Sequence, residues 1–284
     1  MDFGVSMFVT DYAIAPAELA KALEERGFES MWAPEHSHIP VARQSPWPGG
    51  GELPRPYYEV MDPFVVLSHA AAATKKLKLG TGVCLVIQRD PIQTAKLVAS
   101  IDQVSGGRFL FGIGGGWNAE EIANHGTAFK SRFKLMRERI EAMKEIWTKN
   151  EAEYHGEFVD FAPVYAWPKP VQKPYPPIIL GGAFPHAARR AVRYGNGWVP
   201  IAGRGPYGDI NQYLPLFKEM LAAAGRTLED VPITLFGGSE NVDTLKRHRD
   251  MGVARTVVTL PPAKADQTLP ALDRWAELIR RVNA

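Results

Sequence analysis

The residues of this chain best suited to chemistry follow its second apolar run. That run leads through Pro34 and Glu35 to His36, which places His36 directly beyond a predicted strand. Because an unperturbed imidazole titrates at a pKa of about 6.5, His36 can move a proton at neutral pH. The neighbouring Glu35 could orient a ring, bond a ligand or form an ion pair. We therefore take His36 as the candidate catalytic residue, with a structural hydrogen bond as its alternative role.

Glycines gather just after several other apolar runs, at Gly82, Gly114, Gly115, Gly116, Gly181, Gly182, Gly203, Gly237 and Gly238. Without a Cβ atom, the backbone at such positions can approach a flat or phosphorylated ligand closely. Tight turns between strands and helices would explain each glycine alone, but their shared position favours a cofactor site. Arg204 beside Gly203 either brings a positive charge to that site or lies on a surface loop.

The pair Gly181-Gly182 opens a predicted helix that lacks a side-chain cap. The stretch 181–185 contains no Ser, Thr, Asp or Asn. The first N–H groups of that helix therefore need water or an anion, and a phosphate is a well-founded partner at a helix N-terminus. Arg189 and Arg190, about one turn into the helix, either assist an anion or face solvent.

A second glycine-rich stretch, 109–118, superficially matches a dinucleotide-binding fingerprint. We reject this interpretation because no acidic residue follows a second strand at the distance that the fingerprint requires. Asn118 and Glu121 instead form the pattern of a capping box at the start of a helix. Trp117 either stacks on a flat ring or packs in the rim of the site, and we favour packing.

The remaining candidates have weaker arguments. Cys84 follows the third apolar run, but no activating partner is identifiable and a buried cysteine is commonly inert. His69 and His248 fall on predicted helices, and His38 is less well placed than His36. No HExxH, CxxC or calcium-loop motif is present, so we expect no metal site.

The elements that must position these residues are eight short apolar runs, at 5–9, 30–33, 77–83, 109–113, 178–180, 197–199, 233–236 and 256–260. Most are nearly continuous rather than alternating, which is typical of parallel strands covered on both faces. A helical pattern separates each run from the next. In a (β/α)8 barrel the carboxyl ends of the strands form the catalytic face, where the residues above would meet.

Helix signals support this alternation, with Asp62-Pro63 and Asp90-Pro91 each supplying a cap and a proline preset for the first turn. Helices are predicted at 16–26, 64–74, 92–104, 133–147, 185–194, 209–224, 241–251 and 267–282. Two insertions, near 37–59 and 151–177, interrupt the pattern, and the second contains a predicted hairpin at 153–158. We predict an α/β protein with a single TIM barrel domain over residues 1–284, and a doubly wound sheet is the alternative.

Composition narrows the class of partner. The chain has 284 residues, 45% of them hydrophobic and 23% charged, which is typical of a globular enzyme. Its 33 Lys and Arg against 31 Asp and Glu give +2 with the signs interspersed, so we expect no nucleic acid and no membrane partner. The single Cys84 excludes an intrachain disulfide, and no secretion signal is recognised. We expect a cytoplasmic protein that acts on a small molecule.

Three stretches together carry a family resemblance. They are residues 27–36 (GFESMWAPEH), 79–83 (LGTGV) and 105–118 (SGGRFLFGIGGGWN). Nearly the whole chain resembles the bacterial luciferase-like monooxygenase superfamily, and specifically its branch of F420-dependent oxidoreductases. The resemblance implies a luciferase-like barrel that binds FMN or the deazaflavin coenzyme F420 and performs hydride chemistry at the coenzyme ring.

The resemblance also assigns roles to individual residues. His36 matches the active-site histidine of the family, and Glu35 matches an acidic residue that contacts the cofactor. Family members carry a bulge with a non-prolyl cis peptide behind the ring, and the matching bond joins Gly82 to Val83. The cofactor-binding residues expected are Glu35, Gly82, Val83, Gly114, Gly116, Trp117, Gly181, Gly182, Ala183 and Phe184, with the phosphate near Gly181 and Gly182.

One departure from the family limits the choice of substrate. F420-dependent sugar-phosphate dehydrogenases of the superfamily carry a glutamate at the position of Trp117, which argues against glucose-6-phosphate as the substrate. We expect an F420-dependent oxidoreductase that acts on a small organic molecule. The alternatives are an FMN-dependent monooxygenase and a non-catalytic flavin-binding barrel. A homodimer is expected from the resemblance alone.

Overall fold

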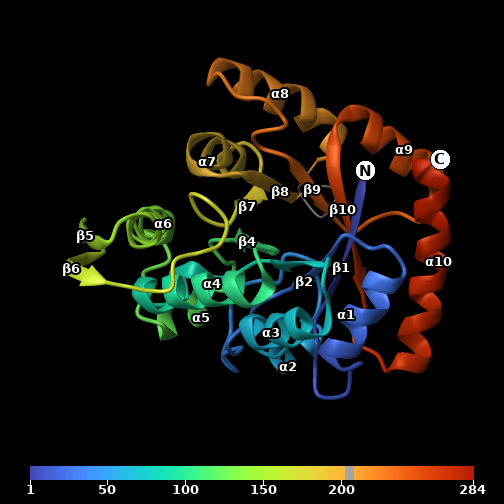
Figure 1. Cartoon of the computed structure of the whole chain (residues 1–284), viewed down its shortest axis with the longest axis horizontal. Helices are drawn as coiled ribbons and strands as arrows, with labels where there is room; N and C mark the ends of the chain where they lie inside the picture. The colour runs from blue at the N-terminus through green and yellow to red at the C-terminus, as the bar shows by residue number, and fades with distance from the viewer. Residues whose placement is uncertain (202–207) are drawn as a thin grey trace.

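The centre of the structure is a closed parallel barrel. In this computed structural model, which describes residues 1–201 and 208–284, eight strands pair in the order β1-β10-β9-β8-β7-β4-β3-β2 (Figure 1). They are β1 (Asp2–Met7), β2 (Ser30–Ala33), β3 (Lys78–Thr81), β4 (Phe109–Ile113), β7 (Ile178–Ala183), β8 (Gly197–Ile201), β9 (Ile233–Phe236) and β10 (Val253–Leu260). The TIM barrel prediction is confirmed, and the doubly wound sheet was the wrong alternative. Gly203 and Arg204 lie outside the described residues.

Helices cover the outside of the barrel (Figure 1). They are α1 (Pro16–Glu25), α3 (Pro63–Ala73), α4 (Pro91–Ser105), α6 (Arg132–Thr148), α7 (His186–Tyr194), α8 (Ile210–Ala223), α9 (Val242–Met251) and α10 (Ala265–Asn283). The predicted caps are present, since Asp62 accepts hydrogen bonds from the amides of Phe64 and Val65, and Asp90 accepts one from Gln93. These caps fix where α3 and α4 begin behind the site.

Five smaller elements lie in the loops. The first insertion contains α2 (Pro56–Glu59), the 3-10 helix η1 (Val86–Gln88) follows β3, and α5 (Ala119–Asn124) follows β4. The second insertion forms the antiparallel hairpin of β5 (Glu151–His155) and β6 (Asp160–Tyr165), as predicted. Figure 1 shows this hairpin beyond α6, at the edge of the molecule. The short α2 was not predicted, because its surroundings are rich in Pro and Gly.

Two strand ends differ from the prediction, and both affect the site. β7 continues to Ala183, so Gly181 and Gly182 pair with Val199 and Pro200 of β8 instead of forming a turn. β3 is shorter than predicted, because the ladder stops at Thr81 and the chain leaves it at Gly82. Glycines in these strands leave space for large side chains that pack close to the backbone. Their assignment to turns did not predict this role.

The barrel interior is filled around one buried indole, Trp32 of β2. A Cβ atom on Gly80 of the adjacent strand would lie 2.4 Å from the Trp32 ring, so only glycine fits there. The indole Nε1 donates a hydrogen bond of 2.8 Å to Ser30 Oγ, as a buried polar group requires. The neighbours that complete this interior layer are Leu110, Ile179, Val199 and Val257.

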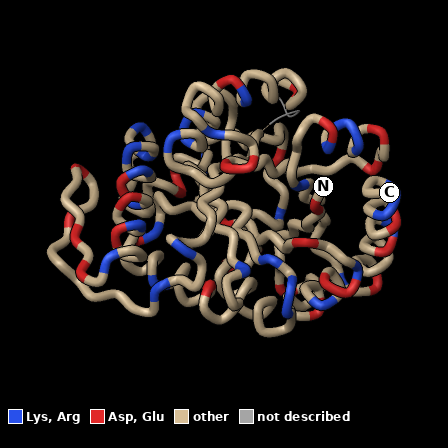
Figure 2. The backbone as a smooth tube through the Cα atoms, turned by 45° about the horizontal axis from the view of Figure 1, so that its top comes forward, with Lys and Arg blue, Asp and Glu red and all other residues tan. Residues whose placement is uncertain are grey.

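Charged groups of both signs are spread over the chain (Figure 2). One ion pair is largely buried at the end of the barrel opposite the carboxyl ends of the strands. Arg255 Nε donates to Glu29 Oε2 at 2.7 Å, and Lys78 Nζ lies 2.9 Å from Glu29 Oε1. Burial alone would raise the pKa of Glu29, but the hydrogen bonds and charge of Arg255 outweigh it and lower this pKa to about 2. Within the described residues, every helix is too short or too polar to cross a membrane.

We expect Glu29→Gln to lower the free energy of unfolding by about 3 kcal/mol at pH 7, because it leaves Arg255 buried without a charged partner. The pKa of Glu29 is lowered by folding, so this contribution is present above about pH 4.5 and is lost as the pH falls toward 2. Urea unfolding at pH 7 and pH 3 should show a smaller difference from wild type at pH 3.

Lys78→Gln is the matched control for this ion pair, because the Lys78 side chain is 46% exposed. Its effect should stay within about 1 kcal/mol. A Glu29→Gln protein as stable as wild type at pH 7 would show that the Arg255 pair adds nothing to stability.

Candidate active site

His36 is held by a buried carboxylate at the carboxyl end of the barrel. Its Nδ1 lies 2.8 Å from Oε2 of Glu121, and the two side chains are 7% and 1% exposed. The other carboxylate oxygen, Oε1, accepts a hydrogen bond of 3.2 Å from the Ser37 amide. No hydrogen bond to His36 Nε2 is found among the described residues. The imidazole is therefore fixed through one nitrogen and available through the other.

This arrangement suits proton transfer. An ionised Glu121 only accepts hydrogen bonds, so Nδ1 of His36 carries the hydrogen and Nε2 holds a lone pair. A carboxylate in this position keeps the ring in one tautomer and stabilises the imidazolium that forms when Nε2 takes a proton. His36 with Glu121 can thus serve as a general base, and as a general acid in the reverse direction.

Glu121 is the functional residue that the sequence analysis missed. Asn118 does cap α5, accepting a hydrogen bond of 3.3 Å from the Glu121 amide, so one half of the predicted capping box is confirmed. The other half is wrong, because the Glu121 side chain turns to His36 instead of reaching back to Asn118. The capping-box pattern already explained a glutamate at position 121. Nothing in the sequence indicated that its carboxylate would bind His36, 85 residues away.

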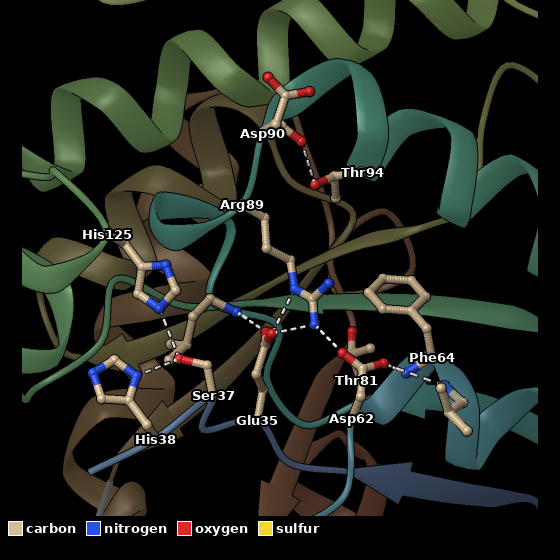
Figure 3. Close-up of polar contacts among 12 residues, drawn as sticks. Glu35, Ser37, His38, Asp62, Phe64, Thr81, Arg89, Asp90, Thr94 and His125 are labelled. Atoms are coloured by element: carbon tan, nitrogen blue, oxygen red, sulfur yellow. Dashed lines mark hydrogen bonds and ion pairs between the residues drawn. The ribbon is translucent and has the colours of Figure 1, made fainter. Parts of the chain in front are cut away.

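Glu35 is directed to a different partner, which corrects its assignment to the cofactor. Its Oε2 accepts a hydrogen bond of 2.6 Å from the Leu85 amide, and Oε1 pairs with Arg89, which also binds Asp62 (Figure 3). The carboxylate is only 4% exposed. Both oxygens are thus used within the protein, where they tie the loop after β2 to the segment after β3. Of its three predicted roles, the ion pair is the one observed.

A second histidine cluster lies beside His36. Ser37 Oγ is 3.0 Å from His38 Nδ1 and 2.7 Å from His125 Nε2 (Figure 3), and Asn124 Nδ2 is 2.8 Å from His38 Nε2. Burial lowers the pKa of His125, and the neighbouring His38 lowers it further. The folded chain therefore favours a neutral His125, and this part of its stability is lost as the pH falls below the ordinary pKa of histidine. The cluster connects the His36 loop to the end of α5.

The peptide bond between Gly82 and Val83 is cis, as the resemblance predicted. The Val83 side chain lies between two of the predicted cofactor glycines. A Cβ atom on Gly114 would be 2.6 Å from Val83 Cγ2, and one on Gly181 would be 3.0 Å from Val83 Cγ1. These glycines thus make room for Val83, which explains their missing side chains without a ligand.

Two further residues near this bond have structural explanations. A Cβ atom on Gly116 would lie 3.0 Å from Ile122 Cδ1, and the φ of +64° at Gly116 disfavours other residues. Cys84 is fully buried, and burial followed by the charge of Glu35 raises the pKa of its thiol well above the ordinary value. A thiol in this state is a poor nucleophile, in agreement with the prediction that Cys84 packs.

Two arginines lie beside the glycines at the ends of β4 and β7. The guanidinium groups of Arg190 and Arg132 lie 4.0 and 4.3 Å from the ring centroid of Phe133, so they enclose one aromatic ring. A Cβ atom on Gly182 would be 3.9 Å from Arg190 Nη2, and one on Gly115 would be 2.4 Å from Phe133. From the sequence, Arg190 could either assist an anion or face solvent, and Arg132 was not predicted to take part.

Among the described residues, neither arginine has a carboxylate partner, and Arg132 Nη1 donates a hydrogen bond of 2.7 Å to the Phe129 carbonyl. Burial lowers the pKa of both guanidinium groups, and in Arg132 the charge of Arg190 lowers it further. The Nε atoms of both are buried without a hydrogen-bond partner in the described part of the chain. Two close, partly desolvated cations with unused donors form a site that an anion would complete.

The start of α7 is less distinctive than the sequence suggested. Its N-cap, Pro185, provides no side-chain hydrogen bond, but the same holds for α1, α6 and α10. Ala183 ends β7, and the Phe184 ring stacks on Tyr213 with centroids 4.9 Å apart. Arg190 and Arg132, more than the missing cap, therefore mark this edge of the barrel for an anion.

Trp117 packs beside His36. Their ring centroids are 5.8 Å apart with an edge-on arrangement, and Arg43 lies 5.4 Å from the Trp117 ring centroid. This is the packed role that the sequence favoured. The side chain therefore belongs to the surroundings of His36, and its prediction as a cofactor contact is not supported by these contacts.

A parallel barrel with an oriented histidine at the carboxyl ends of its strands has the architecture of an enzyme. The family model described as Luciferase-like monooxygenase matches residues 12–238, and the chain belongs to this family. Its members are oxidoreductases that use flavin or deazaflavin coenzymes.

Individual relatives agree with the family. The uncharacterized protein Rv0953c of Mycobacterium tuberculosis is 38% identical over 97% of this chain and 98% of its own. An F420-dependent glucose-6-phosphate dehydrogenase of Amycolatopsis mediterranei is 31% identical over 77% of this chain and 62% of its own. The crystal structure of the monooxygenase RslO1 from Streptomyces bottropensis has a TM-score of 0.79 over the full length of both chains, at 20% identity. The last of these shows the shared fold.

We expect His36→Ala to lower kcat by about 10²- to 10⁴-fold, which is the usual contribution of a positioned acid or base. Glu121→Gln should lower kcat in the same direction, because its amide can present an N–H group to Nδ1 and disturb the tautomer. Steady-state rates over pH, with coenzyme affinity measured separately, check both variants.

His69→Ala is the control, because His69 is exposed on α3 and hydrogen-bonds to the carbonyl of Val65. It should retain the wild-type rate. A near wild-type kcat with an unaltered pH profile in His36→Ala would assign His36 a structural role.

Proposed function

We propose that this protein is an F420-dependent oxidoreductase, which transfers a hydride between the deazaflavin coenzyme and a small organic substrate. The observation that carries the proposal is the imidazole of His36, oriented by the buried Glu121 with Nε2 available. Hydride transfer to or from an alcohol or carbonyl group needs a partner for the accompanying proton. The 31% identical relative named as F420-dependent gives independent support.

The residues present fit such a coenzyme. Arg190 and Arg132 have buried Nε donors without partners, which suits the phosphate that FMN and F420 share. Arg190 lies beside Gly182, and the Phe133 ring that contacts both arginines lies against Gly115. In this proposal Gly181, Gly182, Ala183 and Phe184 line the phosphate, and Val83 supports the ring from behind.

The coenzyme, when bound, supplies the hydride chemistry. The chain supplies proton management and a shielded site. His36 exchanges the proton of the substrate oxygen through Nε2, and Glu121 holds the ring and its charge. The aromatic side chains Tyr57 and Trp117, 5.3 and 5.8 Å from the His36 ring centroid, keep water from the imidazole.

We expect the purified protein to bind F420 at least about tenfold more tightly than FMN, a difference of about 1.4 kcal/mol. The choice follows the resemblance of the strand-two and glycine segments to deazaflavin users. Titration with each coenzyme, followed by absorbance and fluorescence, measures it directly. Micromolar binding of FMN without binding of F420 would reverse the assignment to an FMN-dependent monooxygenase. Failure of both to bind would remove the proposal.

We expect Arg190→Leu to weaken coenzyme binding by about ten- to hundredfold, the value of a charge-assisted hydrogen bond to a phosphate. Arg189→Leu is the matched control on the same helix, because Arg189 is exposed, and it should change the affinity less than twofold. Calorimetric titration with the preferred coenzyme compares the two variants. Equal losses in both would indicate general electrostatics instead of a defined phosphate contact.

A further inference from the structure

His36 lies beside an aromatic cluster to which the first insertion contributes Trp47 and Tyr57. Tyr57 of α2 lies 5.3 Å from the His36 ring, 5.8 Å from Trp47 and 6.4 Å from Trp117, measured between ring centroids. Phe8, just beyond β1, lies 4.6 Å from the Tyr57 ring. All four aromatic side chains are partly exposed. We call Phe8, Trp47, Tyr57 and Trp117 the aromatic wall.

The start of α5 fixes the insertion that carries this wall. The Glu120 carboxylate accepts hydrogen bonds from the amides of Gln44 and Ser45, at 3.1 and 3.3 Å. In return, the Ala119 amide donates to Ser45 Oγ at 3.0 Å. Glu121, which follows Glu120 on the same helix, holds His36. One short helix therefore holds both the imidazole and residues 44–45 of the insertion, just before Trp47.

In the described part of the chain, the two charged residues beside the wall, Arg43 and Glu120, already have partners. Arg43 donates a hydrogen bond to the Ser45 carbonyl and lies over the Trp117 ring at 5.4 Å. Glu120 is occupied by the two backbone amides of the insertion. What the wall offers a ligand is therefore mainly aromatic surface, with the Nε2 atom of His36, the Tyr57 hydroxyl and the indole N–H groups of Trp47 and Trp117 as its polar points.

We infer that the substrate is an uncharged molecule with an apolar ring and one hydroxyl or carbonyl oxygen. Its ring packs on the aromatic wall, and its oxygen forms a hydrogen bond with His36 Nε2. Burying apolar surface against such rings is favourable, whereas a phosphate or carboxylate placed there would lose hydration without gaining a free cation from the described residues. The inference rests on the proposed function and specifies the substrate class of the same site.

A pair of matched probes tests this class. Benzylacetone carries a phenyl ring and an uncharged ketone, and 3-phenylpropionate replaces the methyl ketone with a carboxylate at nearly the same size. Glucose-6-phosphate represents the polar, anionic class. Each is titrated calorimetrically into protein saturated with the coenzyme that it binds. Benzylacetone should bind at least tenfold more tightly than either anion.

Variants of the wall locate the binding. Tyr57→Leu and Trp47→Leu should each weaken benzylacetone binding about three- to tenfold, the usual value of an aromatic contact. Tyr165→Leu is the control, since Tyr165 is 74% exposed on the distant hairpin, and it should bind as wild type does.

The outcomes separate this inference from the proposed function. Loss of binding in Tyr57→Leu but not in Tyr165→Leu, with the neutral ketone preferred, supports the class. If the protein binds a coenzyme but prefers glucose-6-phosphate or 3-phenylpropionate to benzylacetone, and Arg43→Met loses this preference, the inference is overturned. The proposed function would still stand in that case. Undetectable benzylacetone binding at millimolar concentration also overturns it. If neither coenzyme binds, the proposed function and the inference fall together.

Discussion

The burial of the Glu121 carboxylate is the constraint on which the site depends. A carboxylate that is 1% exposed must be fully satisfied by donors, because its desolvation is otherwise very costly. His36 and the Ser37 amide provide these donors from the loop after β2, while Glu121 itself comes from α5 after β4. Two segments far apart in the chain are thereby joined over the barrel. The orientation of the imidazole is a consequence of satisfying this buried charge.

The adjacent residues Glu35 and His36 show how neighbours in sequence can serve different parts of a site. Glu35 turns to Arg89 and the Leu85 amide, which anchors the segment after the cis peptide bond. His36 turns to Glu121 and keeps one nitrogen available. One residue thus stabilises the loop from which the other acts. A single substitution at Glu35 would disturb several loops at once, so a change in activity there would say little about contact with the coenzyme.

The strands and main helices could be predicted because their signals are local. Continuous apolar runs, together with caps such as Asp62 and Asp90, specify elements without knowledge of their partners. The role of Glu121 could not be predicted, since a glutamate three residues after Asn118 already fits a helix start. The glycines were assigned to a ligand for a similar reason. Only the structure shows that Val83 fills the space beside Gly114 and Gly181.

The motifs that carry the family resemblance lie mainly in the scaffold. Arg108, for example, donates hydrogen bonds to the carbonyls of Leu77 and Ala71, and so joins the start of β3 to the end of α3. Of the two aromatic rings beside His36, Trp117 belongs to the third motif, whereas Tyr57 comes from the insertion after β2. Loops supported by a rigid barrel can change their side chains without altering its core. Family membership therefore constrains the core of this barrel more strongly than the loops around His36, where Tyr57 of the first insertion lies 5.3 Å from the imidazole.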